Sequence, residues 1–121
     1  MIESIISMEL PAGGHLAVRR NRICPKQETK QYRRISLVSG IHGDELEGQY
    51  ICYETARRVK EHPEYLKGIV DIYPALNPLG IDMASRTVPR LEMDMNRMFP
   101  GDASGDMMER ITATVVDSLI G

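Results

Sequence analysis

A histidine and a glutamate stand three residues apart, as His42 and Glu45, in a segment that reads Gly-Ile-His-Gly-Asp-Glu. At a turn between a strand and a helix both side chains can face one point, where an imidazole and a carboxylate can supply two ligands to a zinc ion. Gly40 and Gly43 flank the histidine and allow unusual dihedral angles and close approach of the backbone. Taken alone, the pattern also fits a surface turn in which Asp44 caps the helix and the histidine does no chemistry.

A second group of polar residues follows further along the chain. It begins with Asn77-Pro78-Leu79-Gly80, continues with Arg86 and ends with Asp94-Met95-Asn96-Arg97-Met98-Phe99-Pro100-Gly101. The adjacent Asn96 and Arg97 offer an amide and a planar guanidinium fork, which suit a substrate carboxylate. Arg86 could face a reacting carbonyl and stabilise an oxyanion. Taken alone, the same residues fit a solvated loop with a Pro-Gly turn.

The two groups together form the series G-x-H-G-D-E-x-x-G, N-P-x-G, an arginine and D-x-N-R-x-F-P-G. In this order and at these spacings, the series resembles the succinylglutamate desuccinylase/aspartoacylase family, which belongs with the zinc carboxypeptidases. The motifs cover residues 40–101, and we expect the likeness to extend over the whole chain. The resemblance implies part of a three-layer α/β fold of the zinc-carboxypeptidase type, with a mixed, largely parallel sheet and flanking helices.

The resemblance also implies an activity and a cofactor. The protein would be a zinc-dependent deacylase that hydrolyses the amide bond of an N-acyl amino acid or a similar carboxylate-bearing substrate. His42 and Glu45 would be two of the three protein ligands of the zinc. Arg86 would polarise the scissile carbonyl, and Asn96 with Arg97 would hold the substrate's carboxylate.

Four further residues receive supporting roles from the same resemblance. Asp94 would accept a hydrogen bond from the second ring nitrogen of His42, which fixes the tautomer and orientation of a zinc-bound histidine. Arg90 is a weaker candidate for the carbonyl-polarising role. Asn77 and Gly80 are expected to shape their loop without contacting the substrate.

The family's third zinc ligand and its general base have no counterpart in this chain. The ligand is a histidine in an Asp-x-His segment on the strand after the last helix expected here, and the base is a glutamate further along. His15 and His62 do not fit that motif and are expected at the surface. We therefore expect residues 1–121 to be the N-terminal portion of the catalytic domain, truncated before the third ligand and inactive by itself.

Two other functions fit the same residues. One is a peptidase of the metallocarboxypeptidase type, because a carboxylate clamp suits the removal of a C-terminal residue equally well. The other is a non-catalytic domain that binds a metal or an anion through these loops. A nucleotide-binding loop is disfavoured, because the chain lacks both the Lys-Ser/Thr of a P-loop and a G-x-G-x-x-G pattern.

The elements expected to position the motifs alternate between strands and helices. Strands are predicted over residues 14–20, 35–39 and 68–76, and helices over residues 45–61 and 106–120. The strand, helix, strand order predicts a right-handed crossover with parallel pairing. Residues 21–33 are predicted to be a loop and residues 77–105 an irregular functional stretch.

Side-chain patterns add detail to the two helices and to the motif loop. Asp106 is predicted to cap the second helix, and Cys52 to fill the core under the first. A group of methionines near the motif loop is interpreted as adaptable packing: Met93, Met95, Met98, Met107 and Met108. Mostly small residues at helical spacing predict the face that the first helix turns to the sheet: Gly48, Ile51, Cys52, Thr55, Ala56 and Val59.

Composition limits the class of partner. The chain has 121 residues, 42% hydrophobic and 26% charged, as expected of one soluble domain or part of one. The net charge of −2 argues against nucleic acid as a partner. No apolar run reaches the roughly 18–20 residues of a membrane span. The first residues, Met1-Ile2-Glu3-Ser4, have no basic or apolar signal region, so no secretory signal is expected. The two cysteines form no C-x-x-C pair, so a reducing cytoplasm is expected.

Charge and strand count suggest two further features. Basic residues are in excess between residues 19 and 34, where Glu28 alone opposes them. We interpret this segment as a solvated loop, because Tyr32 is the one aromatic residue there that could support a polyanion site. A sheet with an unpaired edge also predicts association with a second copy of the chain. The expected partners are thus a small N-acyl amino acid or peptide-like substrate and a homo-oligomer.

Overall fold

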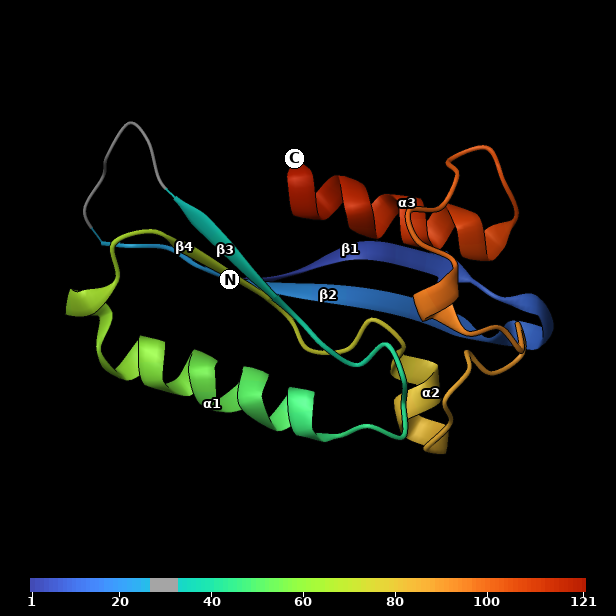
Figure 1. Cartoon of the computed structure of the whole chain (residues 1–121), viewed down its shortest axis with the longest axis horizontal. Coiled ribbons are helices and arrows are strands. Elements are labelled where there is room, and N and C mark those ends of the chain that lie inside the picture. The colour runs from blue at the N-terminus through green and yellow to red at the C-terminus, as the bar shows by residue number, and fades with distance from the viewer. Residues whose placement is uncertain (27–32) are drawn as a thin grey trace.

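A four-stranded mixed sheet lies at the centre of the computed structural model, which describes residues 1–26 and 33–121. Helix α1 covers one face of the sheet and helix α3 the other, and the short helix α2 lies at one end (Figure 1). The strand order is β1-β2-β4-β3, with bounds Ile2–Glu9, His15–Ile23, Ile69–Tyr73 and Arg34–Val38 respectively. The helices span Glu47–Glu61, Pro78–Met83 and Met107–Ile120.

Chain connectivity explains the pairing of the strands. A short turn joins β1 to β2, so these strands are antiparallel, and the amide of Leu10 closes the turn on the carbonyl of Gly14. Helix α1 carries the chain from β3 back to a parallel β4, as predicted for the crossover. The α/β class and the mixed sheet are confirmed. Among the described strands the parallel pairing is confined to β3 and β4, because β4 meets β2 antiparallel.

The N-terminal half contains more strand than the sequence analysis predicted. Strand β1 was not predicted, and β2 runs to Ile23 instead of ending before a loop at residue 21. Of the predicted loop, residues 27–32 lie outside the described residues. The basic segment is also less solvated than expected. Arg22 makes two hydrogen bonds of 2.7 Å to the buried Asp71, and Arg34 lies 3.9 Å from the same carboxylate.

The larger core lies between the sheet and α3. Its fully buried members include Leu16, Val18, Tyr73, Ile111 and Val115. The methionines near the motif loop belong to this core, as predicted: two are buried and three pack against it, namely Met95, Met108, Met93, Met98 and Met107.

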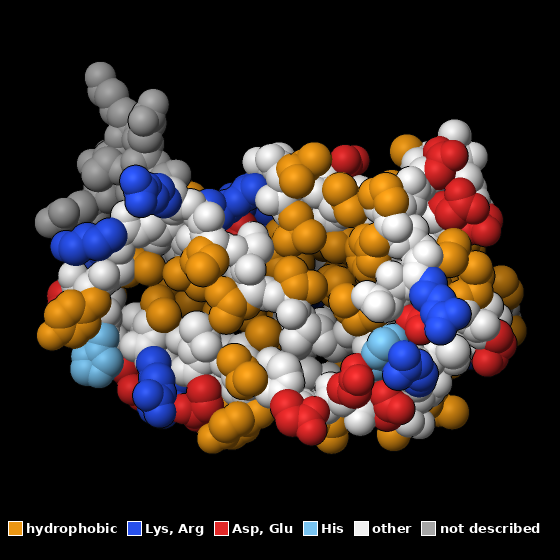
Figure 2. Space-filling model, in the orientation of Figure 1, with side chains coloured by type: hydrophobic (Ala, Val, Ile, Leu, Met, Phe, Trp, Pro, Cys, Tyr) orange, Lys and Arg blue, Asp and Glu red, His pale blue; other side chains and the backbone are white. Residues whose placement is uncertain are grey.

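A smaller core under α1 contains Cys52, Val70 and Ile72, which confirms Cys52 as a core residue. Ile51, predicted to face the sheet, is 58% exposed instead, although the next residue, Cys52, is buried. Figure 2 shows hydrophobic side chains in the hollow between α1 and α3, along the side where β3 runs. Both helices otherwise have nearly the predicted bounds.

The ends of α3 are held by side chains. Asp106 accepts a hydrogen bond of 2.9 Å from the amide of Glu109, which confirms it as the N-cap. Arg34 donates to the carbonyls of Leu119 and Gly121, which have no partner within the helix. Among the described helices, none is long and apolar enough to cross a membrane.

Candidate active site

The loops that carry the motifs meet where the parallel strands β3 and β4 end (Figure 1). The amide of Ser39 donates to Tyr73, and the amide of Asn77 donates to Gly40 at 2.8 Å. The amide of Gly43 then donates to the carbonyl of Ser85, also at 2.8 Å. In open α/β sheets ligands bind beyond the carboxyl ends of the strands, so these contacts place the motifs at the expected end of the sheet.

Two glycines are needed for this meeting of loops. Gly40 has a φ of +73°, and a Cβ atom there would lie 2.8 Å from the carbonyl oxygen of Pro74. Gly43 is buried, and a Cβ atom would overlap the backbone of Gly80. The sequence analysis predicted close approach or unusual dihedrals at both positions: the backbone approach is close at both, and φ is positive at Gly40.

His42 lies between two carboxylates. Its Nδ1 atom is 2.8 Å from Oε2 of Glu45, and its Nε2 atom donates to Oδ1 of Asp94 at 2.8 Å. The His42 side chain is 11% exposed and that of Asp94 is 14% exposed, whereas the Glu45 side chain is 61% exposed. The structure therefore brings together the three residues to which the sequence analysis gave the roles of two ligands and an orienting acceptor.

This arrangement demands positive charge on the ring. A neutral imidazole carries one N–H, and a carboxylate only accepts hydrogen bonds, so both contacts are favourable together only with a second proton or another cation at Nδ1. The hydrogen bond to Asp94 accordingly raises the pKa of His42, and the bond to Glu45 adds to this, although burial opposes both. The same bond, together with one from the amide of Asn96, lowers the pKa of Asp94.

Two arginines approach the far oxygen of the Asp94 carboxylate. The Nε atom of Arg97 lies 3.6 Å from Oδ2, and that of Arg86 lies 3.8 Å from it. The two arginine side chains are 81% and 57% exposed. These distances exceed a hydrogen bond, so neither Nε atom donates to the Asp94 carboxylate. The exposed Asn96 follows in the same turn, so the predicted clamp residues gather around Asp94.

Arg90 lies apart from this group. Its Nη1 atom donates to the carbonyl of Pro11 at 2.7 Å, in the turn between β1 and β2. Arg86, and not Arg90, therefore lies near Asp94, the residue that contacts His42. The other two histidines, His15 and His62, are exposed as predicted and contact Glu9 and Glu64.

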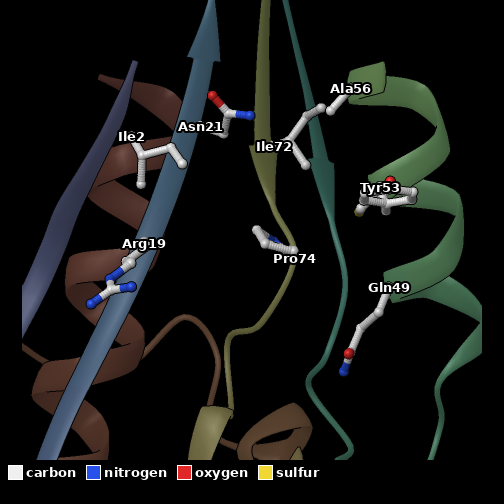
Figure 3. Close-up of a pocket in the computed structure, with 9 residues that line it drawn as sticks. Ile2, Arg19, Asn21, Gln49, Tyr53, Ala56, Ile72 and Pro74 are labelled. Atoms are coloured by element: carbon white, nitrogen blue, oxygen red, sulfur yellow. The ribbon is translucent and has the colours of Figure 1, made fainter. Parts of the chain in front are cut away.

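A cavity of about 230 Å³ opens beside the histidine and is lined by Ser39, Gly40, Ile41, His42, Glu45 and Gly48. Figure 2 shows a histidine ringed by Lys, Arg, Asp and Glu side chains at the α2 end of this face. A separate cavity of about 270 Å³ lies between α1 and strands β2 and β4, where Arg19, Asn21 and Gln49 meet apolar side chains (Figure 3). It contains none of the predicted site residues.

The donor set for a metal is incomplete within the described part of the chain. No group of three or more His, Cys, Asp or Glu side chains there could hold a metal ion, whereas catalytic zinc takes three protein ligands.

The sequence analysis missed one contact of the site, that of Ser85, whose carbonyl accepts a hydrogen bond from the amide of Gly43 in the histidine loop. A contact through a backbone atom leaves no trace in the residue type, so no sequence signal could have found it.

Comparison with known proteins gives a family match and a similar relative. The model of the succinylglutamate desuccinylase/aspartoacylase catalytic domain matches residues 31–120. An N-alpha-acetyl-L-2,4-diaminobutyric acid deacetylase of Halomonas elongata is 36% identical over 75 residues, which are 62% of this chain and 21% of that protein.

Solved structures match nearly the whole chain. A succinylglutamate desuccinylase/aspartoacylase from Rhodobacter sphaeroides has a TM-score of 0.75 and 28% identity, over 98% of this chain and 36% of that one. The product-bound ectoine utilization protein EutE (DoeB) from Ruegeria pomeroyi has a TM-score of 0.74 and 24% identity, which shows the fold, over 98% of this chain and 37% of that one. The chain thus spans about a third of the length of these structures.

Proposed function

The chain belongs to the succinylglutamate desuccinylase/aspartoacylase family, and we propose that it supplies part of the active site of a zinc-dependent deacylase. The substrate class is an N-acyl amino acid whose amide bond is hydrolysed. Support comes from the family match and from the relative named as a deacetylase. The observation that carries the proposal is the placement of His42 between the carboxylates of Glu45 and Asp94.

A zinc ion fits this placement in chemistry and in charge. Nδ1 of His42 and the Glu45 carboxylate are donors of the type that zinc takes, and a cation there would relieve the need for a second ring proton. Asp94 holds the opposite nitrogen and thereby leaves Nδ1 to face the metal. Zinc bound at such a site supplies Lewis acidity and lowers the pKa of its bound water.

The chain's own charged residues would bind and orient the substrate. Arg97 and Asn96 are exposed beside His42 and would take the carboxylate of the amino-acid part. Arg86 would donate to the carbonyl oxygen of the scissile amide, where negative charge develops. Asp94 would keep both arginines close to the site without occupying their donors, because it lies beyond hydrogen-bonding distance of each.

Within the described residues, His42 and Glu45 are two of the three protein ligands that catalytic zinc takes, and we assign the third ligand and the general base to none of the others. The proposal therefore concerns an active site to which these residues contribute the His42 and Glu45 pair, the Arg86 oxyanion donor and the carboxylate clamp.

Turnover of a defined substrate panel tests the proposal. The protein expressed from its own gene is incubated with N-succinylglutamate, N-acetylaspartate, N-α-acetyl-2,4-diaminobutyrate and a short peptide with a free C-terminal carboxylate. We expect release of the amino acid from at least one acylated substrate, loss of this activity with a strong chelator, and recovery with zinc. The matched variants His42→Ala and His62→Ala should be inactive and active respectively.

Other outcomes of the same experiment would contradict the proposal. Cleavage of the peptide alone would indicate a metallocarboxypeptidase. Stoichiometric zinc without turnover of any substrate would indicate a domain that only binds metal. Activity that is insensitive to the chelator would show that the hydrolysis does not depend on zinc.

A further inference from the structure

The motif Asn77-Pro78-Leu79-Gly80 has no part in the chemistry proposed above, yet Asn77 is fully buried. We propose that the side chain of Asn77 is a positioning residue that fixes the zinc-ligand loop against the loop carrying Arg86. This inference rests on the proposed function for its catalytic meaning, and on the contacts of Asn77 for its structural meaning. It goes beyond the expectation that Asn77 and Gly80 shape their own loop, because it joins two other loops through Asn77.

The amide of Asn77 bridges two loops that are distant from each other in sequence. Its Nδ2 atom donates to the carbonyl of Ile41 at 3.2 Å and to the carbonyl of Thr87 at 3.0 Å. Ile41 immediately precedes His42, and Thr87 immediately follows Arg86. One planar group therefore touches the neighbours of the proposed zinc ligand and of the proposed oxyanion donor.

The remaining contacts fix the bridge in place. Oδ1 of Asn77 accepts a hydrogen bond of 2.9 Å from the amide of Gly80 at the start of α2. The backbone amide of Asn77 donates to Gly40, and the amide of Gly43 donates to Ser85 next to Arg86. The histidine loop is therefore held at its carbonyls by Asn77 and at an amide by the arginine loop.

Asparagine is the side chain that meets these demands. Its amide supplies two N–H donors and one acceptor from one rigid plane, and here the two donors and the acceptor all have partners. Aspartate would keep the acceptor for Gly80 but would lack the donors, and an apolar residue would lack both. A buried carbonyl without a donor is costly, so either replacement favours separation of the two loops.

Gly80 is part of the same hydrogen-bonded bridge. A Cβ atom at Gly80 would overlap the amide group of Asn77. The Gly80→Ala substitution should therefore push the amide away from its carbonyl partners while leaving the chemistry of Asn77 unchanged. Two substitutions on different residues thus predict the same opening of the loops.

Amide hydrogen exchange, measured on the protein expressed from its own gene, tests the structural part. In Asn77→Asp, the amide of Gly43 should exchange at least about tenfold faster than in the wild type. The amide of Gly80 should stay within about twofold, because the new carboxylate still accepts from it. Tyr73→Phe is the matched control: it removes a buried hydrogen bond to Ser118, and Gly43 should keep its wild-type protection.

Gly80→Ala provides a second and independent variant. It should also speed the exchange of the Gly43 amide. If Asn77→Asp does not fold, Gly80→Ala by itself tests whether Asn77 joins the two loops. Unchanged protection of Gly43 in a folded Gly80→Ala or Asn77→Asp protein would overturn the proposal. Equal loss of protection at Gly43 and throughout β1 and β2 would also overturn it, because that result indicates general destabilisation.

The catalytic meaning is tested by a double-mutant cycle on an acylated amino acid that the protein hydrolyses. If Asn77 acts by placing Arg86, Asn77→Asp should lower kcat about tenfold or more with little change in KM. In the Arg86→Ala background, the same substitution should lower kcat by less than about twofold. If the two substitutions instead multiply their separate effects on kcat, Asn77 does not act by placing Arg86. If no amide is hydrolysed, the proposed function fails, while the exchange experiment still decides whether Asn77 joins the loops.

Discussion

The buried frame of the candidate site contrasts with the side chains that the frame carries. Asn77, Gly40, Gly43 and Gly80 are buried and are packed against backbone. The side chains with proposed chemistry face solvent to a much greater degree, except for His42, which Asp94 holds from behind. Backbone contacts of the buried residues set the shape of the site, and the exposed side chains set what it can bind.

This difference predicts two kinds of mutational effect. A substitution in the frame forces backbone atoms apart or leaves buried polar groups without partners, so it should lower stability. A substitution of an exposed arginine removes few packing contacts, so it should leave stability nearly unchanged while it removes a function. The experiments below measure stability, function or both, and the property that changes separates the frame from the reacting groups.

Arg86→Ala should have the largest effect, and on turnover. Loss of one oxyanion donor typically lowers kcat about 100- to 1000-fold, while the unfolding midpoint should hardly move because the side chain is exposed. Arg86→Lys should restore only part of kcat, since lysine offers a point charge in place of a fork. Steady-state kinetics and thermal unfolding check this prediction. A collapse of substrate affinity with unchanged kcat would instead make Arg86 a binding residue.

Arg97→Ala should weaken the binding of substrates that carry a carboxylate. Loss of one partner from a hydrogen-bonded charge pair costs roughly 2–4 kcal/mol, or about 30- to 1000-fold in affinity. An analogue whose carboxylate is amidated should lose much less, because it never engaged the guanidinium. Affinities for both ligands, measured on wild type and variant, check this. Equal losses of affinity for the two ligands would contradict the assignment of Arg97 to the carboxylate clamp.

Gly43→Ala should show the opposite behaviour, with its main effect on stability. The new Cβ atom would overlap the backbone of Gly80, and overpacking of this kind costs about 1–3 kcal/mol in the free energy of unfolding. The neighbouring Asp44→Ala, at an exposed position, is the matched control and should stay within about 0.5 kcal/mol of wild type. Urea unfolding measures both. Similar stability of the two variants would show that the loops do not pack as described.

The buried Asp71 should produce the smallest effect near neutral pH and a visible one in acid. Burial alone would raise the pKa of Asp71, but the hydrogen bonds and charge of Arg22, with the charges of Arg20 and Arg34, lower it overall. Stability from this group is therefore complete above the unfolded pKa of about 3.9 and is lost as the pH falls through the lower folded pKa.

Urea unfolding between about pH 2 and pH 6 measures this acid dependence. Asp71→Asn, which removes the titrating group, should be less stable than the wild type at pH 6 and should approach it at the acid end. A wild type whose acid dependence is unchanged by Asp71→Asn would contradict the ion pair. The test applies to a part of the sheet remote from the catalytic chemistry, so it checks the frame without involving substrate.

The sequence predicted those features that depend on local pattern. Helical spacing predicted α1 and α3 within two residues at each end, and the apolar runs predicted β3 and β4. Local spacing predicted that His42 and Glu45 would share one turn, and the family resemblance implied that Asp94 would meet His42; the structure brings the three together. Strand β1 was missed although Ile6, Met8 and Leu10 alternate with polar residues, and α2 was missed although Asn77 and Pro78 are a typical helix start.

Other features depend on contacts between distant residues and leave no local pattern. The spacing on α1 predicts which side chains share a face, but it does not fix which of them the sheet covers, so Ile51 was placed wrongly. The bond from Arg90 to Pro11 links residues far apart in sequence. The pairing of Arg22 with Asp71 likewise required the strand order to be known.

Zinc content tests the central claim most directly. The protein expressed from its own gene, its His42→Ala and Glu45→Gln variants and the controls His15→Ala and His62→Ala are dialysed against a weak chelator and analysed for zinc. We predict about one zinc per chain in the wild type and both controls, and loss of zinc in the first two variants. Full zinc in His42→Ala, or loss of zinc in His15→Ala or His62→Ala to the same degree, would contradict the account.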